Sequence, residues 1–108
     1  MTDRERHRWG SFHDATLLDL CLDWKTGILT INLRVGIPRA GVVQLRANRV
    51  SLLDCPRRFP WGPSVSVNEV RGPTPSVEGE RLEIEVQSGD TLVVIGESFV
   101  LGEVVEAS

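Results

Sequence analysis

Apolar and polar residues alternate along most of this chain, a pattern typical of β-strands that bury one face. In residues 15–24 we expect a strand, and its buried face carries Leu18, Leu20, Leu22 and Trp24. Residues 28–35 repeat the alternation, and Gly27 between the two runs suits a tight turn with a positive φ. The two runs together predict a β-hairpin.

The middle of the chain alternates less regularly. Residues 42–53 begin with the same period, but the phase changes near Val50, which predicts a bulge or two short strands. Pro38 interrupts the pattern before this run, because it lacks a main-chain donor. We expect a further strand around Val65 and Val67, and a long polar turn over residues 71–80.

The clearest alternation comes near the end of the sequence. Residues 82–86 and 91–95 read as two strands joined by a tight turn, with Gly89 at positive φ, and residues 98–105 add an edge strand. No window of ten residues shows helical periodicity, although one short N-terminal helix stays open. The sequence therefore predicts an all-β, mainly antiparallel meander of about six to eight strands, arranged as a curled sheet, a sandwich or a small barrel.

Length and composition narrow the class of protein. The chain of 108 residues forms one domain, residues 1–108, and we expect residues 1–9 and 106–108 to be flexible. A net charge of -3 argues against nucleic acid as a partner, since binding phosphates requires a basic face. The chain contains neither a run of about 18 apolar residues nor a secretory signal, so no membrane association is expected. Cys21 and Cys55 show no CxxC spacing and fit half-buried thiols of a cytoplasmic protein.

His13 and Asp14 are the most reactive-looking pair in the sequence. Neighbours on a strand point to opposite faces, so the two side chains share a site only in a loop. With only two histidines in the chain, we favour Asp14 closing a turn and His13 packing under Phe12 or Trp9. The scattered cysteines and histidines predict no metal site, and no cofactor is expected.

The segment RRFPWGPS, residues 57–64, combines arginines, aromatic rings, prolines and a glycine. One hypothesis is that Phe59 or Trp61 folds back and closes an open end of the sheet, where burial of a ring stabilises by roughly 2–3 kcal/mol. The other is that this stiffened loop, with Arg57 and Arg58, anchors a partner, because arginine and aromatic residues are enriched at binding hot spots. We slightly favour closure of the sheet. The two hypotheses are compatible if one ring closes the sheet and the other anchors a partner.

Three short motifs give the chain a family resemblance. They are FHDA at Phe12–Ala15, PWG at Pro60–Gly62 and IEVQSGD at Ile84–Asp90. With these motifs the chain resembles a group of small uncharacterised bacterial β-proteins, some of which are similar to the immunity protein 50 family of toxin systems. The resemblance implies a stoichiometric binder that neutralises a toxin, and it brings no catalytic residues with it.

We therefore expect a non-catalytic protein-interaction module whose partner is another protein, such as a toxin. Its predicted contact residues are Arg57, Arg58, Phe59 and Trp61, with His13 and Asp14 as neighbours.

Three alternatives remain open. The first is a β-barrel that binds a small molecule through inward-facing Arg46 or Asn48. The second is a hydrolase-like enzyme that uses His13 and Asp14 with a further partner such as Asp90 or Glu97. Self-association through an uncovered edge strand is compatible with each of these functions.

Overall fold

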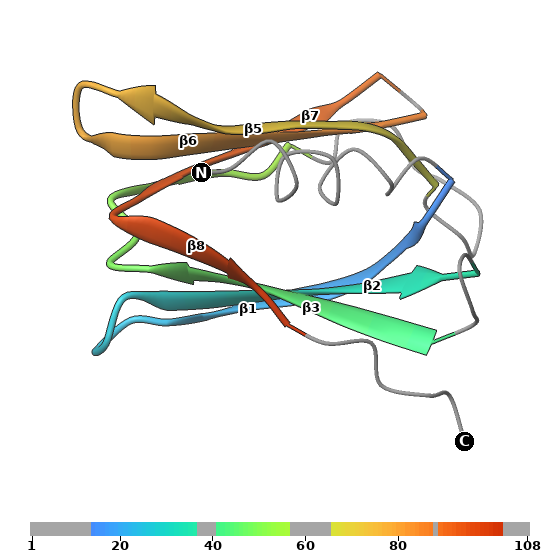
Figure 1. Cartoon of the computed structure of the whole chain (residues 1–108), viewed down its shortest axis with the longest axis horizontal. Helices are drawn as coiled ribbons and strands as arrows, with labels where there is room; N and C mark the ends of the chain where they lie inside the picture. The colour runs from blue at the N-terminus through green and yellow to red at the C-terminus, as the bar shows by residue number, and fades with distance from the viewer. Residues whose placement is uncertain (1–13, 37–40, 57–65, 88, 103–108) are drawn as a thin grey trace.

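The computed structural model describes residues 14–36, 41–56, 66–87 and 89–102. In these residues the chain forms eight strands and no helix. The strands make two four-stranded antiparallel sheets that lie face to face and do not close into a barrel (Figure 1). This confirms the all-β antiparallel prediction and selects the sandwich among the three predicted architectures. No helix of the described residues is long and apolar enough to cross a membrane.

Each sheet takes strands from both halves of the chain. The first sheet has the order β1-β2-β3-β8 and consists of Thr16–Asp23, Ile28–Val35, Gly41–Asn48 and Ser98–Leu101. The second has the order β4-β7-β6-β5 and consists of Leu52–Asp54, Thr91–Gly96, Gly79–Val86 and Val67–Ser76. The phase change near Val50 therefore marks the point where the chain leaves the first sheet for the second. The predicted break at Pro38, the flexible ends and the N-terminal helix lie outside the described residues.

The core lies between the two sheets and follows the predicted alternation. The strands β2 and β3, and β6 from Leu82 onward, bury every second residue, and the alternate residues face outward. Full burial of one such aliphatic side chain stabilises by roughly 1.5–3 kcal/mol. The aliphatic side chains with at most 1% of their surface exposed are Leu29, Leu33, Leu45, Val67, Leu82, Ile84 and Val94.

The strand β1 departs from the predicted alternation at both ends. A bulge between Leu17 and Asp19 leaves Leu18 39% exposed, and Leu17 packs against the core in its place. Trp24 was expected to be buried but is 88% exposed, because the strand ends at Asp23 and Trp24 opens the turn. Alternation in the sequence cannot predict either result, since a bulge changes which residues face the core and a turn ends the alternation.

Residues 71–80 were expected to form a long polar turn, and this was wrong. The strand β5 continues to Ser76, with register shifts between Val67 and Glu69 and between Arg71 and Thr74. The turn itself contains only residues 77–78. An edge strand tolerates proline, because one of its sides needs no main-chain donors. Composition therefore suggested a loop where the structure places an irregular edge.

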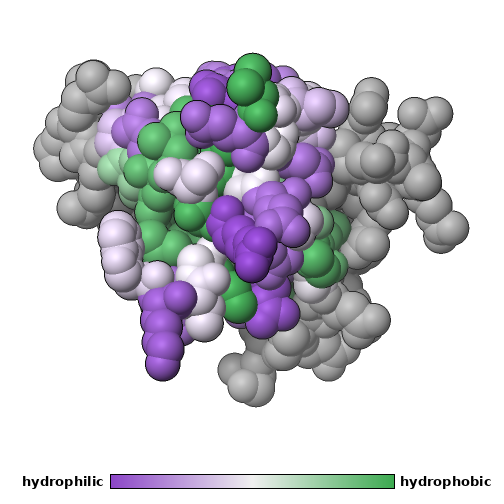
Figure 2. Space-filling model, turned by 90° about the vertical axis from the view of Figure 1, so that its left-hand side faces the viewer, coloured by the Kyte–Doolittle hydropathy of each residue, from purple (hydrophilic) through white to green (hydrophobic). Residues whose placement is uncertain are grey.

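The two ends of the sandwich differ in their connections. At one end, here called the short-turn end, the strands are joined by residues 24–27, 49–51, 77–78 and 97. At the other, the loop end, they are joined by residues 36–40, 55–66 and 87–90, and β1 begins there. Figure 2 looks onto the short-turn end, where hydrophilic side chains cross the centre beside apolar ones. The longest connection of the fold, residues 55–66, thus begins and ends at the loop end.

Candidate functional site

The first described residues bind the second sheet at the loop end. The Asp14 amide donates to the Val67 carbonyl at 2.8 Å, and the Val67 amide donates to the Ala15 carbonyl at 2.7 Å. Thr16 and Ser66 form an isolated antiparallel bridge. Asp14 has a φ of 68°, a left-handed conformation that aspartate adopts more readily than most residues. The start of β1 is therefore held against the start of β5.

The turn between β6 and β7 also forms hydrogen bonds with the residues at the starts of β1 and β5. The Gln87 amide donates to the Ser66 carbonyl at 2.9 Å, and Gln87 Nε2 donates to Asp14 Oδ1 at 3.4 Å. The predicted positive φ of Gly89 is confirmed at 104°. We call the group Asp14, Ala15, Ser66, Val67 and Gln87 the Asp14 corner.

The Asp14 corner brings together parts of the chain that carry the sequence motifs. Asp14 and Ala15 end the first motif, and Gln87 belongs to the third. The loop containing the second motif leaves β4 at Asp54, which pairs with Val93 near the start of β7, and therefore begins at the loop end. It re-enters the described chain at Ser66, within the corner. The described residues that flank each of the three motifs therefore lie at one end of the sandwich.

Most of the contact residues expected from the sequence lie outside the described residues. These are Arg57, Arg58, Phe59, Trp61 and His13. Asp14 is described, and its side chain contacts Gln87. The expected turn at Asp14 is consistent with its left-handed backbone.

The two acidic residues considered as partners of His13 and Asp14 lie at opposite ends. Asp90 follows Gly89 at the loop end and is the one buried charged residue in the described part of the chain, with 1% of its surface exposed. Its carbonyl accepts the Val86 amide at 3.0 Å. Glu97 lies at the short-turn end, where it forms an exposed ion pair with Arg49 at 3.4 Å. Asp90 alone shares the end of the sandwich that holds Asp14.

Arg46 and Asn48 do not line an interior ligand site. Arg46 is exposed on the outer face of β3. Asn48 is half-buried, and its Nδ2 donates to Ser98 Oγ of the neighbouring strand at 3.0 Å. Among the described residues the buried core cluster is aliphatic, and Phe99 is partly buried against it. The small-molecule hypothesis thus loses the polar residues on which it depended.

The two thiols were expected to be at least half-buried, but both cysteines are exposed and unpaired with each other. Cys21 lies on the outer face of β1, whose alternate residues pack inward. For Cys55, partial desolvation of the sulfur and then the nearby Asp54 charge raise the pKa of the thiol, although the residue as a whole is exposed. A raised pKa makes this thiol a poor nucleophile at neutral pH. Within the described ranges no group of three His, Cys, Asp or Glu residues could hold a metal ion.

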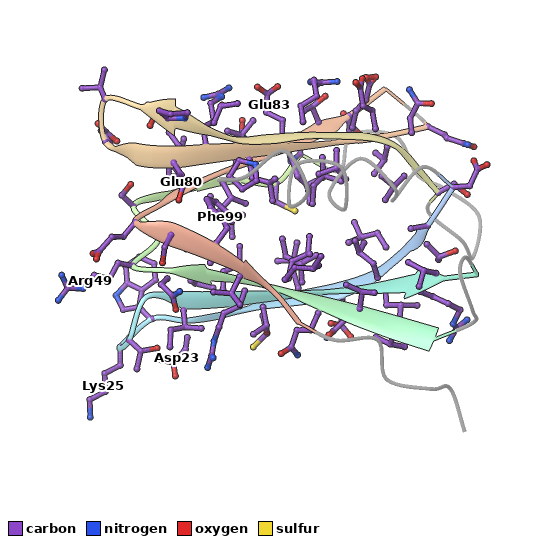
Figure 3. All side chains as sticks on the ribbon, in the orientation of Figure 1. Asp23, Lys25, Arg49, Glu80, Glu83 and Phe99 are labelled. Carbon is purple, nitrogen blue, oxygen red and sulfur yellow. The ribbon has the colours of Figure 1, made fainter. Side chains whose placement is uncertain are left out.

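An ion-pair network covers the outer face of the second sheet. Arg71 on β5 contacts Glu69 at 3.0 Å and both Glu83 and Glu85 at 3.3 Å, while Arg81 contacts Glu83 at 3.2 Å. Figure 3 shows Glu83 projecting from this face, away from the core. Alternation over residues 82–86 is enough to put Glu83 and Glu85 on one face of the strand, but it cannot reveal Arg71, which fell in the expected turn.

The network shifts the pKa values of its members. The hydrogen bond from Arg81 and those from Arg71 outweigh partial desolvation and hold the pKa of Glu83 below its usual value. For Arg71, desolvation acts to lower the pKa, but the three carboxylates together raise it. These directions indicate a structural network in which both signs of charge are stabilised.

Comparison of the whole chain with known proteins gave no match: no family model matches the chain, and no curated protein or solved structure is significantly similar to it.

Proposed function

We propose that this protein is a non-catalytic binding module whose loop end contacts another protein. The single observation behind the proposal is that the described residues flanking the three motifs lie at one end of the sandwich, where the longest connection begins and ends. Binding residues are commonly found on loops that a rigid scaffold positions. The contact residues proposed for this end are Arg57, Arg58, Phe59, Trp61, His13 and Asp14.

The hydrogen-bonded backbone of the Asp14 corner favours a binding role over a role that requires this backbone to move. Main-chain hydrogen bonds of 2.7–2.9 Å hold both ends of the Asp14 corner, so its residues need little ordering when a partner docks. The resemblance to immunity proteins suggests a toxin as the partner, which would be neutralised by surface complementarity rather than by chemistry. A cytoplasmic location in a bacterium belongs to the same proposal.

The test begins with capture of a partner from the native host and continues with the purified pair. The Phe59→Ala/Trp61→Ala double variant should bind the identified partner at least tenfold more weakly, which corresponds to about 1.4 kcal/mol or more. Trp24→Ala is the matched control, because Trp24 is an exposed tryptophan at the short-turn end, and its affinity should stay within about twofold of wild type.

Circular dichroism and thermal melting of each variant must accompany the affinities. If the double variant melts far below wild type, the two rings close the core and the contact proposal is wrong. Equal weakening by Trp24→Ala would instead place the contact surface at the short-turn end.

A further inference from the structure

The two most exposed large apolar side chains of the described residues lie at the tips of two hairpins. Trp24, in the turn between β1 and β2, is 88% exposed, and Val77, in the turn between β5 and β6, is fully exposed. The other exposed large apolar side chains are between 39% and 51% exposed and lie on strands, namely Leu18, Leu52 and Val100. A partner that covered both tips would therefore bury the most exposed apolar surface in this part of the chain.

Both tips belong to the short-turn end, and main-chain contacts fix them relative to each other. In Figure 1 the two hairpins, one from each sheet, turn at the left-hand side of the molecule. The Val50 amide donates to the Gly27 carbonyl at 2.9 Å, which joins the first turn to the connection between β3 and β4. A Cβ on Gly96 would lie 3.6 Å from the Val50 Cα, and one on Gly79 would lie 2.5 Å from the Gly96 carbonyl oxygen. The two tips are therefore linked by packed main chains and need little ordering when a partner docks.

Each of these apolar residues is followed in the sequence by a charged residue, and the two charges have opposite signs. Lys25 follows Trp24, and Glu78 follows Val77. Both charged residues are exposed, and neither side chain forms an ion pair with another described residue. Figure 3 shows Lys25 pointing away from the molecule, while the Asp23 carboxylate beside it accepts two main-chain amides of its own turn. One tip thus presents an apolar side chain with a cation, and the other presents an apolar side chain with an anion.

We propose that the short-turn ends of two copies of this chain dock on each other around a two-fold axis. The axis passes between the two tips, so the tip between β1 and β2 of each copy meets the tip between β5 and β6 of the other. Trp24 of each copy then contacts Val77 of the other, and Lys25 contacts Glu78 in the same way. An isologous contact needs a surface that is complementary to itself, and the exchange of two unlike tips meets this condition.

The second copy is the favoured partner because it matches the charges of both tips at once. An acidic partner surface would place a like charge opposite Glu78, and a basic one would do the same at Lys25. Figure 2 shows hydrophilic side chains across the centre of this end, which can stay hydrated while the tips touch. Two hairpin tips cover less area than a standard interface, so we expect weak association. The contact leaves the loop end uncovered and does not rest on the proposed function.

The first test is sedimentation equilibrium of the full chain in about 0.15 M salt, which screens charges far from the contact. The wild-type mass should be 12.0 kDa in dilute solution and approach twice this value as the concentration rises. Lys25→Glu and Glu78→Lys each place like charges together at both contacts of the dimer, and each should weaken dimerisation by about tenfold. Trp24→Ala should weaken it by a similar factor.

Arg34→Glu is the matched control for Lys25→Glu, because it changes the net charge by the same amount. Arg34 is exposed and lies at the end of β2 that leads to the loop end. This variant should therefore dimerise as wild type does. If it weakens dimerisation as much as Lys25→Glu, the net charge of the chain controls association and the proposed contact is wrong.

The second test mixes the two charge variants in equal amounts. In a mixed dimer of Lys25→Glu with Glu78→Lys, both contacts join opposite charges, so the mixture should dimerise about as tightly as wild type. A mixture of Arg34→Glu with Glu78→Lys keeps one contact between like charges and should remain weaker. Each variant must melt near the wild-type temperature. A wild-type chain that stays at 12.0 kDa at every concentration, or a mixture that dimerises no more tightly than its separate variants, would overturn the proposal.

Discussion

The two ends of the sandwich are built on different principles. At the short-turn end, glycines allow main chains of different strands to touch: a Cβ on Gly79 would lie 2.5 Å from the Gly96 carbonyl oxygen, and one on Gly96 would lie 2.9 Å from that of Asn48. At the loop end Gly89 also has a positive φ, but a Cβ there would meet nothing within 4 Å. An added methyl group would therefore meet main-chain atoms at Gly79 and Gly96 but open space at Gly89. The two ends thus differ in how closely their main chains approach at these glycines.

At the short-turn end, an exposed side chain lies on a turn whose backbone is held by hydrogen bonds. Trp24 is 88% exposed, yet its turn is held by the Gly27 amide on the Asp23 carbonyl at 2.8 Å and by the Val50 amide on the Gly27 carbonyl at 2.9 Å. Asp23 Oδ1 also accepts the Lys25 amide at 3.0 Å. Figure 3 shows Lys25 and Arg49 pointing away from the molecule at this end.

The largest expected effect comes from adding the same methyl group at each end. Gly79→Ala should lower the free energy of unfolding by about 3 kcal/mol, because the new Cβ meets main-chain atoms and strains a positive φ. Gly89→Ala should cost only about 1 kcal/mol, since the strain of φ remains but the space is open. Urea unfolding of both variants measures the difference. Equal losses would show that the two ends are not distinct in packing.

A smaller effect on stability is expected for the ion-pair network on the outer face of the second sheet. Arg71→Met should lower the free energy of unfolding by about 1 kcal/mol at pH 7, because three carboxylates lose their shared cation. The pKa of Glu83 is lower in the folded chain than its ordinary 4.5, so its contribution is complete above that pH and is lost as the pH falls through the folded pKa. The difference in unfolding free energy between Arg71→Met and wild type should therefore shrink as the pH falls below 4.5.

Arg46→Met provides the control for this measurement. Arg46 is exposed on the outer face of the first sheet. The difference in unfolding free energy between Arg46→Met and wild type should be small and independent of pH. Unfolding curves at pH 7 and pH 3 distinguish the cases: an Arg71→Met loss of equal size at both values would mean that packing, and not charge, is what Arg71 contributes.

The smallest expected effect is that of Trp24→Ala at the short-turn end. The ring is almost fully in water, and the turn is held by main-chain groups, so the melting temperature should change by less than the equivalent of about 0.5 kcal/mol. A loss above about 2 kcal/mol would indicate that the ring packs in solution and that the contrast between the ends is overstated.

Some features of this protein were determined by the sequence alone. Alternation at Leu29 to Val35 and at Leu82 to Val86 fixed strands with one buried face, because a period of two matches only the pleat of a β-strand. Gly27 and Gly89 marked turns through their need for positive φ, and both are confirmed at 72° and 104°. These are local preferences that each segment expresses wherever it lies.

Other features were decided only in the tertiary structure. The same alternation is compatible with a curled sheet, a barrel or a sandwich, because it says which face is buried but not which strand lies beside it. The exposure of Trp24, the bulge at Leu18 and the Arg71 network depend on where a strand ends and which strand is its neighbour. The Asp14 corner is the clearest case: Gln87 contacts Asp14 across 73 positions of sequence, and only the packing of the two sheets brings them together.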